Sequence, residues 1–308
     1  IQVRLRRLHL SAGEGTQERT RSIPQSVAAI KRGVAVSNPL VIYHAKCPDG
    51  IAAAWAAWMV YRPLGEYLPA SYGDPPPADE VVEDRDVILV DFSYPRDALV
   101  RLHGAAKSLL VIDHHKTAQE ALDGLPYAIF DQERSGAGLA WDVLHDGKPR
   151  PWVIGYTEDR DLWRFRLPDS HEINAWLRAQ PRTLEGYDAV NATPLDVARE
   201  LGRAILAEQR VYIEQEKRKA SLAMVGAFGP VPVVNTGRHC ASEIVGELSE
   251  GYPFAASWQE RDGLIHYELR SREGGADVSV IARLFGGGGH KHAAGFSAPK
   301  AVHTEVAP

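Results

Sequence analysis

The chain has 308 residues, a net charge of −5 and the composition of an ordinary globular protein, with 44% hydrophobic and 24% charged residues. Its length favours two domains, and its acidic balance excludes a protein that binds polyanions over its whole surface. No apolar run reaches the roughly 20 residues that are needed to cross a bilayer, so no membrane association is expected. The two cysteines, Cys47 and Cys240, form no metal-binding spacing, and this usage favours a reducing, cytoplasmic location.

The first segment, residues 1–36, is expected to be a mostly solvated extension. Arg4, Arg6 and Arg7 resemble the start of a targeting signal, but no apolar stretch or cleavage site follows them. We therefore expect the first folded domain to span residues 37–192.

Three short apolar runs in this first domain have the pattern of strands that are buried on both faces. They contain almost no alternation of polar and apolar residues, which is typical of parallel sheets. The runs are Pro39–Tyr43, Asp86–Val90 and Ser108–Ile112. Helical patterns follow them at Ile51–Tyr61, Ala98–Gly104 and Gly136–Leu144. The alternation predicts an α/β fold with a doubly wound, mostly parallel sheet.

Polar residues stand at the carboxyl end of each of these runs, where open parallel sheets bind ligands. They are His44–Asp49, Asp91 and Asp113–His115. A fourth acidic cluster, Glu158–Asp161, follows the strand-like run Trp152–Tyr156. Clustered carboxylates repel one another unless cations lie between them, and a mixed Asp/His set suits Mn²⁺ or Mg²⁺. A metal site is therefore expected at this edge of the sheet.

The second half of the chain begins with a long charged helix, expected over Thr193–Ala223, that connects two domains. Beyond it lie strand-like pieces at Val231–Asn235, Phe254–Gln259 and Leu264–Arg270, then a helix at Val278–Phe285 and the sequence GGGGHKHAAGF at Gly286–Phe296. We place the connector at residues 193–223, a smaller α/β domain at 224–300 and a tail at 301–308.

The motifs together resemble those of the DHH phosphoesterase superfamily. HAKCPDG, VDFS, DHH and EDRDLW are similar, in order, to its four motifs, and GGGGHKHAAGF is similar to the signature of its associated C-terminal domain. The family includes RecJ-type exonucleases, oligoribonucleases that also dephosphorylate 3′-phosphoadenosine 5′-phosphate, cyclic-dinucleotide hydrolases and family II pyrophosphatases. The C-terminal GGGH sequence resembles the nuclease and phosphatase members and disfavours a pyrophosphatase.

The resemblance implies a site for two divalent ions, expected to be Mn²⁺, with Mg²⁺ or Co²⁺ as alternatives. Asp91 would bridge the two ions. Asp49, His114 and Asp159 would complete the shell of one ion, and His44 would belong to the other. Water shared by the ions would attack phosphorus at neutral pH.

Two further roles in the reaction follow from the same resemblance. His115 would face the scissile phosphate, binding its oxygen or donating a proton to the leaving group. Asp113 would orient the histidine pair.

Two positions leave alternatives open. Many members of the family carry Asp-x-Asp in the first motif, where this chain has Cys47 and Asp49. Cys47 either binds a softer metal as a thiolate or is not a ligand, and we favour the second interpretation. In the fourth motif we favour Asp159 as the ligand and expect Asp161 to pair with a neighbouring arginine.

Substrate contacts are expected from the C-terminal domain. The resemblance points to a clamp formed by Gly287, Gly288, Gly289 and His290, whose glycine amides can face an anion. Arg270 and Ser271 would contact phosphate; a plain surface charge is the alternative for Arg270. Ser135 either helps to place a phosphate at a helix N-terminus or simply caps that helix.

These residues favour a metal-dependent hydrolase of phosphodiester or phosphomonoester bonds, with short oligonucleotides or nucleotides as substrates. A RecJ-like single-strand exonuclease is the first alternative, but it would need an extended basic channel that the balanced charge does not indicate. The second alternative is a non-catalytic nucleotide-binding protein of the same fold. The sequence leaves the oligomeric state open.

Overall fold

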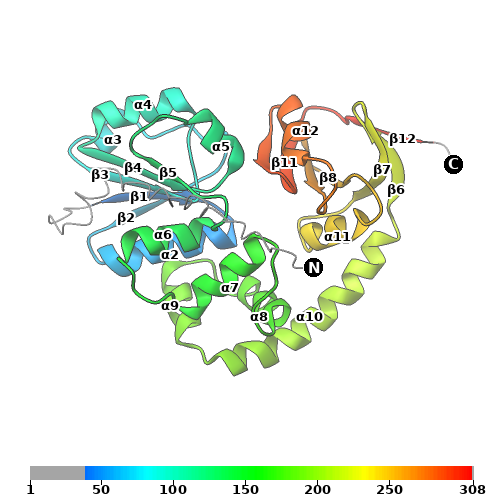
Figure 1. The fold of residues 1–308 in the computed structure, drawn as a ribbon, viewed down its shortest axis with the longest axis horizontal. Coiled ribbons are helices and arrows are strands. Elements are labelled where there is room, and N and C mark those ends of the chain that lie inside the picture. The colour runs from blue at the N-terminus through cyan, green and yellow to red at the C-terminus, as the bar shows by residue number, and fades with distance from the viewer. Residues whose placement is uncertain (1–38, 307–308) are drawn as a thin grey trace, which may run out of the picture.

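The computed structural model describes residues 39–306, which form two lobes that face each other and are joined by one long helix (Figure 1). The extension expected at residues 1–36 lies outside the described residues. The joining helix is α10, Leu195–Lys217, and it lies within the predicted connector. Gly202 of this helix crosses close to α8, Ser170–Arg178, because an added Cβ would lie 1.9 Å from the Glu172 carbonyl oxygen.

The first lobe contains a five-stranded sheet in the order β2-β1-β3-β4-β5, and every neighbouring pair is parallel. The strands are β1 Leu40–His44, β2 Glu66–Ala70, β3 Asp86–Val90, β4 Ser108–Asp113 and β5 Ala128–Phe130. Val90 pairs with both Tyr43 and Ile112, so β1, β3 and β4 end side by side. The predicted doubly wound α/β class is confirmed, and the three polar strand ends meet at one edge.

Helices cover both faces of this sheet (Figure 1). On one face are α3 Asp79–Val82, α4 Arg96–Ala105 and α5 Lys116–Ala121. On the other are α2 Pro48–Tyr61, α6 Gly136–Leu144, α7 Trp152–Asp161, α8 and α9 Leu184–Ala192. Alternate residues of one strand enter different cores: Ile88 belongs to the core that contains Trp55 of α2, and Leu89 to the core that contains Leu99 of α4. All four side chains are fully buried, which explains the unbroken apolar runs.

One strand-like run is helical instead. Trp152–Tyr156, expected to resemble a strand, forms the first half of α7, which begins after Pro151. Val153 and Ile154 are buried among the helices below the sheet. A short apolar run cannot by itself distinguish a buried strand from a buried helical turn, and Pro151 favours the helix start.

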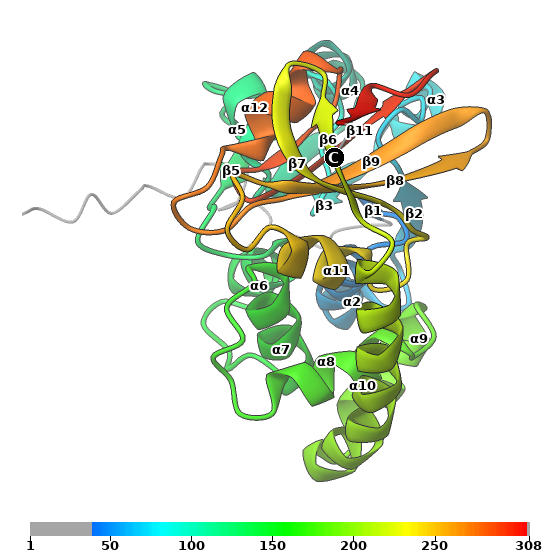
Figure 2. The ribbon, with the colours of Figure 1, turned by 90° about the vertical axis from the view of Figure 1, so that its right-hand side faces the viewer.

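The second lobe contains a seven-stranded mixed sheet in the order β10-β11-β9-β8-β7-β6-β12. Its strands are β6 Ser221–Val225, β7 Phe228–Asn235, β8 Ala255–Arg261, β9 Leu264–Arg270, β10 Gly288–His290, β11 Ala293–Ala298 and β12 His303–Glu305. Helix α12, Val278–Leu284, packs on one face, while α11, Ala241–Leu248, packs on the other beside α10 (Figure 2). The expected tail is partly ordered, because β12 pairs with β6 at the sheet edge.

Within residues 39–306, no helix combines the length and the apolar character that crossing a membrane requires.

Candidate metal centre

Asp91 lies at the middle of the site and has no conventional hydrogen-bond partner for its carboxylate. It directly follows β3 and has a left-handed backbone, with φ 55°, while its amide donates to the Ile112 carbonyl over 2.9 Å. Its side chain is 1% exposed, and neither carboxylate oxygen accepts a hydrogen bond. A buried carboxylate that accepts no hydrogen bond is costly, so this geometry indicates a position for cations.

Histidines and carboxylates surround both oxygens of Asp91. Oδ2 lies 3.4 Å from His44 Nδ1, and Oδ1 lies 3.2 Å from His114 Nε2. His114 Nε2 is also 3.6 Å from an oxygen of Asp49 and 3.6 Å from an oxygen of Asp161. Three sets of possible ligand atoms each lie within 4.8 Å of one another: His44, Asp91 and His115; Asp49, Asp91 and His114; and His114, His115 and His290. Asp91 is shared by the first two sets, as a bridge between two cations requires.

The charges at this centre perturb one another strongly. Burial, reinforced by Asp161 and Asp91, raises the pKa of Asp49 well above its ordinary value. Burial alone would also raise the pKa of Asp91, but interaction with His114 and His44 holds it well below the usual range. Burial opposes protonation of His44, yet Asp91 and Cys47 raise its pKa to about 11. Positive charge is therefore strongly favoured among these carboxylates, and divalent cations can supply it.

The N-terminus of α6 supports Asp49. The amides of Gly136 and Ala137 donate to its two oxygens over 2.6 and 3.1 Å. Gly136 also leaves room for Asp91, since an added Cβ would lie 2.4 Å from the Asp91 Cβ. A helix N-terminus carries partial positive charge, so this contact lowers the cost of burying a second carboxylate beside Asp91.

The start of α6 is fixed by side chains behind it. The hydroxyl of Ser135 accepts from the Gly138 amide over 3.1 Å, so Ser135 is the N-cap, one of the two roles expected for it. The Ser135 amide donates to Glu158 over 3.1 Å, and Arg150 donates to the same carboxylate over 2.8 Å. This network holds the amides that bind Asp49.

Asp113 orients His115. One of its oxygens lies 2.8 Å from His115 Nδ1 and accepts the His114 amide over 2.7 Å, while the Ser93 hydroxyl donates to the other over 2.5 Å. Burial would raise the pKa of Asp113, but the charge and hydrogen bond of His115 lower it to about 2. With Nδ1 engaged, His115 has Nε2 left for a ligand.

In the fourth motif Asp161 lies beside His114, 3.6 Å from its Nε2, whereas Asp159, which was favoured as the ligand, is bound to a loop. Asp159 accepts hydrogen bonds from the Arg166 and Leu167 amides and from the Ser170 hydroxyl, over 2.9, 3.1 and 2.6 Å. These bonds hold the loop that follows α7. Residues two apart on a helix point in different directions, so only one of the two aspartates can face His114.

Cys47 precedes α2 as its N-cap and lies beside His44. Burial, reinforced by Asp91, raises the pKa of its thiol, which favours the neutral form. Over residues 39–306, none of the clustered sets of possible ligand atoms includes Cys47. The interpretation of Cys47 as a non-ligand is therefore the one we retain.

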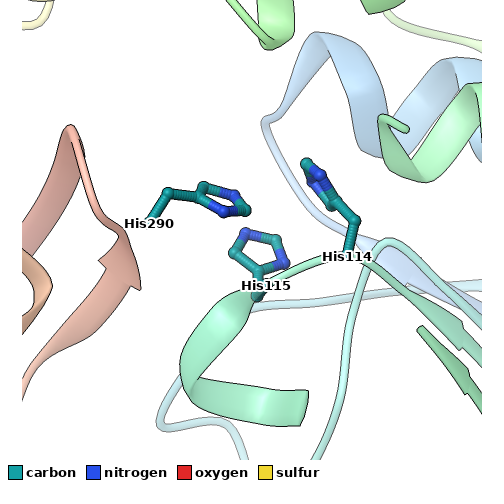
Figure 3. A group of neighbouring side chains, drawn as sticks. All are labelled: His114, His115 and His290. Atoms are coloured by element: carbon teal, nitrogen blue, oxygen red, sulfur yellow. The ribbon is translucent and has the colours of Figure 1, made fainter. Parts of the chain in front are cut away.

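His290 reaches the centre from the second lobe (Figure 3). Its ring lies 4.8 Å from the His115 ring, stacked at 22°, and 4.6 Å from the His114 ring. Burial and the two neighbouring histidines lower the pKa of His290 to about 2, so it is neutral here. The sequence-predicted clamp residue thus lies beside the residue predicted to face the phosphate.

The glycines before His290 allow close backbone contacts. An added Cβ at Gly287 would lie 2.1 Å from the Gly295 oxygen, and Gly289 has φ 139°, which other residues rarely adopt. A Cβ on Gly288 would lie 2.9 Å from the Thr117 hydroxyl of α5, in the other lobe. The segment therefore needs glycine for packing, and contact of its amides with phosphate stays a prediction.

Arg270 and Ser271 border the same cleft, and each makes hydrogen bonds within the second lobe. Arg270 donates to the Ser242 hydroxyl over 2.7 Å. The Ser271 hydroxyl donates to the Ala276 carbonyl over 2.7 Å and lies 2.9 Å from His292 Nδ1. The Ser271 hydroxyl is thus bound to the Ala276 carbonyl, a contact that the sequence did not indicate.

The centre opens into a cleft of about 1780 Å³ that is lined by both lobes. Ion pairs connect the lobes at its borders. Lys116 pairs with Asp277 over 2.6 Å. Glu243 of α11 pairs with Arg160 and Arg178 over 2.8 and 2.6 Å.

Tyr72 was not indicated by any sequence pattern, although its ring lies 5.2 Å from the His44 ring and 5.8 Å from the His115 ring. Tyr72 follows β2, an edge strand that the apolar pattern did not reveal because it contains Glu66 and Pro69.

Comparisons with known proteins identify the fold. No family model matches the chain. An uncharacterized protein of Acanthamoeba polyphaga mimivirus is 26% identical over 281 residues, which cover 84% of this chain and 67% of that protein. A structure of exonuclease RecJ bound to manganese has a TM-score of 0.52 at 16% identity, covering 89% of each chain. RecJ of Thermus thermophilus in complex with Mn²⁺ has a TM-score of 0.50 at 15% identity, over 89% of this chain and 51% of RecJ. The chain thus spans about half the length of that RecJ, and it shares the fold of these RecJ structures.

Proposed function

We propose that the protein is a divalent-metal-dependent phosphoesterase that hydrolyses phosphodiester or phosphomonoester bonds of short oligonucleotides or nucleotides. The observation that carries this proposal is Asp91, whose two buried oxygens lack hydrogen-bond donors and face different sets of ligand groups. Two cations bridged by this carboxylate would supply the missing partners. The similar RecJ structures that were solved with manganese support Mn²⁺ as the metal.

The residues present fit such a pair of ions. Asp49, Asp91 and His114 would hold one ion, with Asp161 beside them, and His44 and Asp91 would contribute to the other. Oxygen and imidazole ligands of this kind suit Mn²⁺, Mg²⁺ or Co²⁺. When bound, two divalent ions stabilise charge on the phosphate oxygens and acidify water.

The remaining residues would position the substrate. His115, held at Nδ1 by Asp113, would direct Nε2 at the scissile phosphate or at the leaving oxygen, to which it would donate a proton. Neutral His290 would contact the same phosphate from the opposite lobe, and Arg270 would bind a further phosphate group. Catalysis would therefore require both lobes at once.

Short substrates are favoured by the charges in the cleft. Basic and acidic side chains both line it, and several of the arginines are paired with carboxylates, such as Arg160 and Arg178 with Glu243. A protein that tracks long strands needs a basic groove that neutralises many phosphates. We therefore place a short oligonucleotide or a nucleotide ahead of long single-stranded DNA, which a RecJ-like exonuclease would degrade.

A substrate screen tests the proposal. Purified protein with Mn²⁺ is assayed on a dinucleotide, a longer oligomer, 3′-phosphoadenosine 5′-phosphate and a cyclic dinucleotide. We expect hydrolysis of at least one short substrate, and loss of turnover in Asp91→Asn but not in the control Asp97→Asn, whose side chain is exposed on α4. Wild-type protein that hydrolyses none of the four, or an Asp91→Asn variant of undiminished activity, would overturn the proposal.

A further inference from the structure

A cluster of charged side chains crosses the cleft where α7 and α8 of the first lobe face α11 of the second (Figure 1). It consists of Arg160 on α7, Arg178 on α8 and Glu243 on α11. All three residues line the cleft, and their side chains are only 16% to 21% exposed. None of the three is among the residues that would hold the metal ions.

Both arginines donate to the same oxygen of Glu243. Arg160 donates to Oε1 over 2.8 Å, and Arg178 donates to the same atom over 2.6 Å. The other oxygen, Oε2, is buried and accepts no hydrogen bond. A buried polar atom without a partner is costly, so the Glu243 carboxylate is an incomplete partner for two guanidinium groups.

Positive charge is in excess at this cluster, because two guanidinium groups share one carboxylate. Burial and the charge of Arg160 lower the pKa of Arg178 from its ordinary value, although Glu243 acts in the opposite direction. Arg182, whose side chain donates to the Lys46 carbonyl over 2.8 Å, adds to the repulsion. A dianion would therefore balance the cluster better than a single carboxylate does.

The two arginines have the chemistry of a site for a tetrahedral oxyanion. A guanidinium group presents a fixed fork of N–H donors that matches the oxygens of phosphate or sulfate. Such an ion offers several oxygens to the two forks, whereas Glu243 offers them only one. The first lobe thus carries both donors of an anion site, and the second lobe supplies the carboxylate that occupies it.

The second lobe holds Glu243 in this position. Ile244 and Val245, the next two residues of α11, are buried in the core of that lobe. Arg270 donates to the hydroxyl of Ser242, the residue before Glu243, over 2.7 Å. Release of the two arginines therefore requires either a new rotamer of Glu243 or a movement of α11 together with the second lobe.

Trp163 of the first lobe lies against the same face of α11. An added Cβ on Gly246, three residues after Glu243, would lie 3.5 Å from Cζ2 of the indole ring. The guanidinium carbon of Arg160 lies 5.8 Å from the centre of that ring. The arginine pair is therefore partly enclosed, and its interaction with an anion is stronger than it would be in open water.

We propose that Arg160 and Arg178 form a binding site for a tetrahedral oxyanion, and that Glu243 is a built-in competitor that occupies this site when the lobes meet. The site takes free phosphate or sulfate, or a phosphate group of a nucleotide. Its occupation does not depend on hydrolysis. The empty cleft thus carries its own counter-ion, and an incoming anion competes with this contact between the lobes.

Calorimetric titration with sulfate tests the competition. Protein loaded with Mn²⁺ is titrated at constant ionic strength, with chloride as the balancing anion, so that general screening stays equal. We expect Glu243→Gln to bind sulfate about 5- to 150-fold more tightly than the wild type, the usual range of coupling between two ligands. Sulfate that binds at the metal centre contributes alike to all the proteins compared.

Further variants show where this gain arises. Adding Arg178→Gln to Glu243→Gln should abolish the gain, and adding Arg160→Gln is an independent second test. Glu250→Gln is the matched control, because it removes the same charge from an exposed glutamate just beyond α11, which pairs with Arg272 over 3.6 Å. An exposed pair of this kind contributes little, so the control should bind sulfate as the wild type does.

Adenosine 5′-monophosphate, as a second probe, identifies the source of the anion. A larger gain in Glu243→Gln for the nucleotide than for sulfate would assign the site to a nucleotide phosphate, and an equal gain would assign it to the free anion. A purely structural Glu243 would lower Tm on substitution without changing either affinity.

Wild-type affinity of Glu243→Gln for both probes, or a gain that survives removal of either arginine, would overturn the proposal. None of these measurements depends on turnover. A failure of this anion site is therefore distinguishable from a failure of the proposed function.

Discussion

Substitution of Gly136 by alanine tests whether the start of α6 fixes the carboxylates of the metal centre. The added methyl group would lie 2.4 Å from the Asp91 Cβ and 2.6 Å from its Oδ1. Ordinary contacts between such atoms are longer than about 3.4 Å, so the backbone of α6 or Asp91 must move by about 1 Å. Neither moves freely, because Asp91 has a left-handed backbone at a strand end and the Gly136 amide is bonded to Asp49.

The expected cost of this overpacking is about 1–3 kcal/mol of unfolding free energy. That cost would lower Tm by about 2–4 °C for each kcal/mol in a protein somewhat smaller than this one. Activity should suffer more, because a 1 Å misplacement of catalytic groups can reduce the rate by about 100-fold. We expect Gly136→Ala to bind Mn²⁺ more weakly and to turn over substrate about 100-fold more slowly.

The measurements are thermal unfolding, calorimetric Mn²⁺ binding and hydrolysis of the best short substrate. Gly104→Ala is the matched control, because Gly104 is also helical and an added Cβ there meets nothing within 4 Å. It should be neutral or slightly stabilising, by up to about 1 kcal/mol. A Gly136→Ala protein with wild-type Mn²⁺ affinity and turnover would show that the α6 start does not determine the geometry of the centre.

Three further predictions concern charge. Asp161→Asn should weaken Mn²⁺ binding by about 10- to 100-fold in calorimetry. Asp159→Asn should change the Mn²⁺ affinity by less than about threefold and should instead lower Tm, because the loop loses hydrogen bonds. The reverse pattern would restore Asp159 as the ligand. Saturating Mn²⁺, at about 100 times Kd, should stabilise the wild type by about 2.7 kcal/mol in thermal unfolding, and Asp91→Asn should lose most of this gain. Despite burial, two arginines lower the pKa of Glu243 to about 2 from an ordinary value of 4.5. The contribution of Glu243 to stability is therefore present above about pH 4.5 and lost as pH falls towards 2. The Tm of Glu243→Gln should fall less steeply than that of the wild type between pH 4.5 and pH 2. An equally steep fall in both proteins would count against the ion pairs.

The sheet could be predicted from the sequence because burial left a clear pattern. Asp86–Val90 is buried at every position, so its apolar run matches β3 at both ends. The edge strand Glu66–Ala70 carries no such pattern, since most of it is only partly covered. β12 was also missed: two of its three residues are exposed, and its pairing with β6 depends on distant parts of the chain.

The candidate site was predictable where a strand end sets the direction of a side chain. His44, Asp91 and the pair that follows Asp113 come together because β1, β3 and β4 end in register. The choice between Asp159 and Asp161 depends instead on the rotation of α7 about its axis, which sequence spacing does not specify. The loop amides that donate to Asp159 settle it, and their positions are set by tertiary structure.

The arrangement of charge allows the two lobes to meet at the candidate metal centre, as the proposed chemistry requires. The first lobe alone supplies three carboxylates that favour cations, those of Asp49, Asp91 and Asp161. It also supplies His115, which is held in place by Asp113. The second lobe adds His290, whose low pKa keeps it uncharged beside His115. The Lys116–Asp277 pair and the close contact of Gly288 with Thr117 hold this junction at the same end of the cleft. A substrate phosphate at the centre would then lie between His115, which the first lobe holds in place, and neutral His290 of the second lobe. Loosening the junction between the lobes should therefore reduce turnover more than it reduces the affinity of the first lobe for metal.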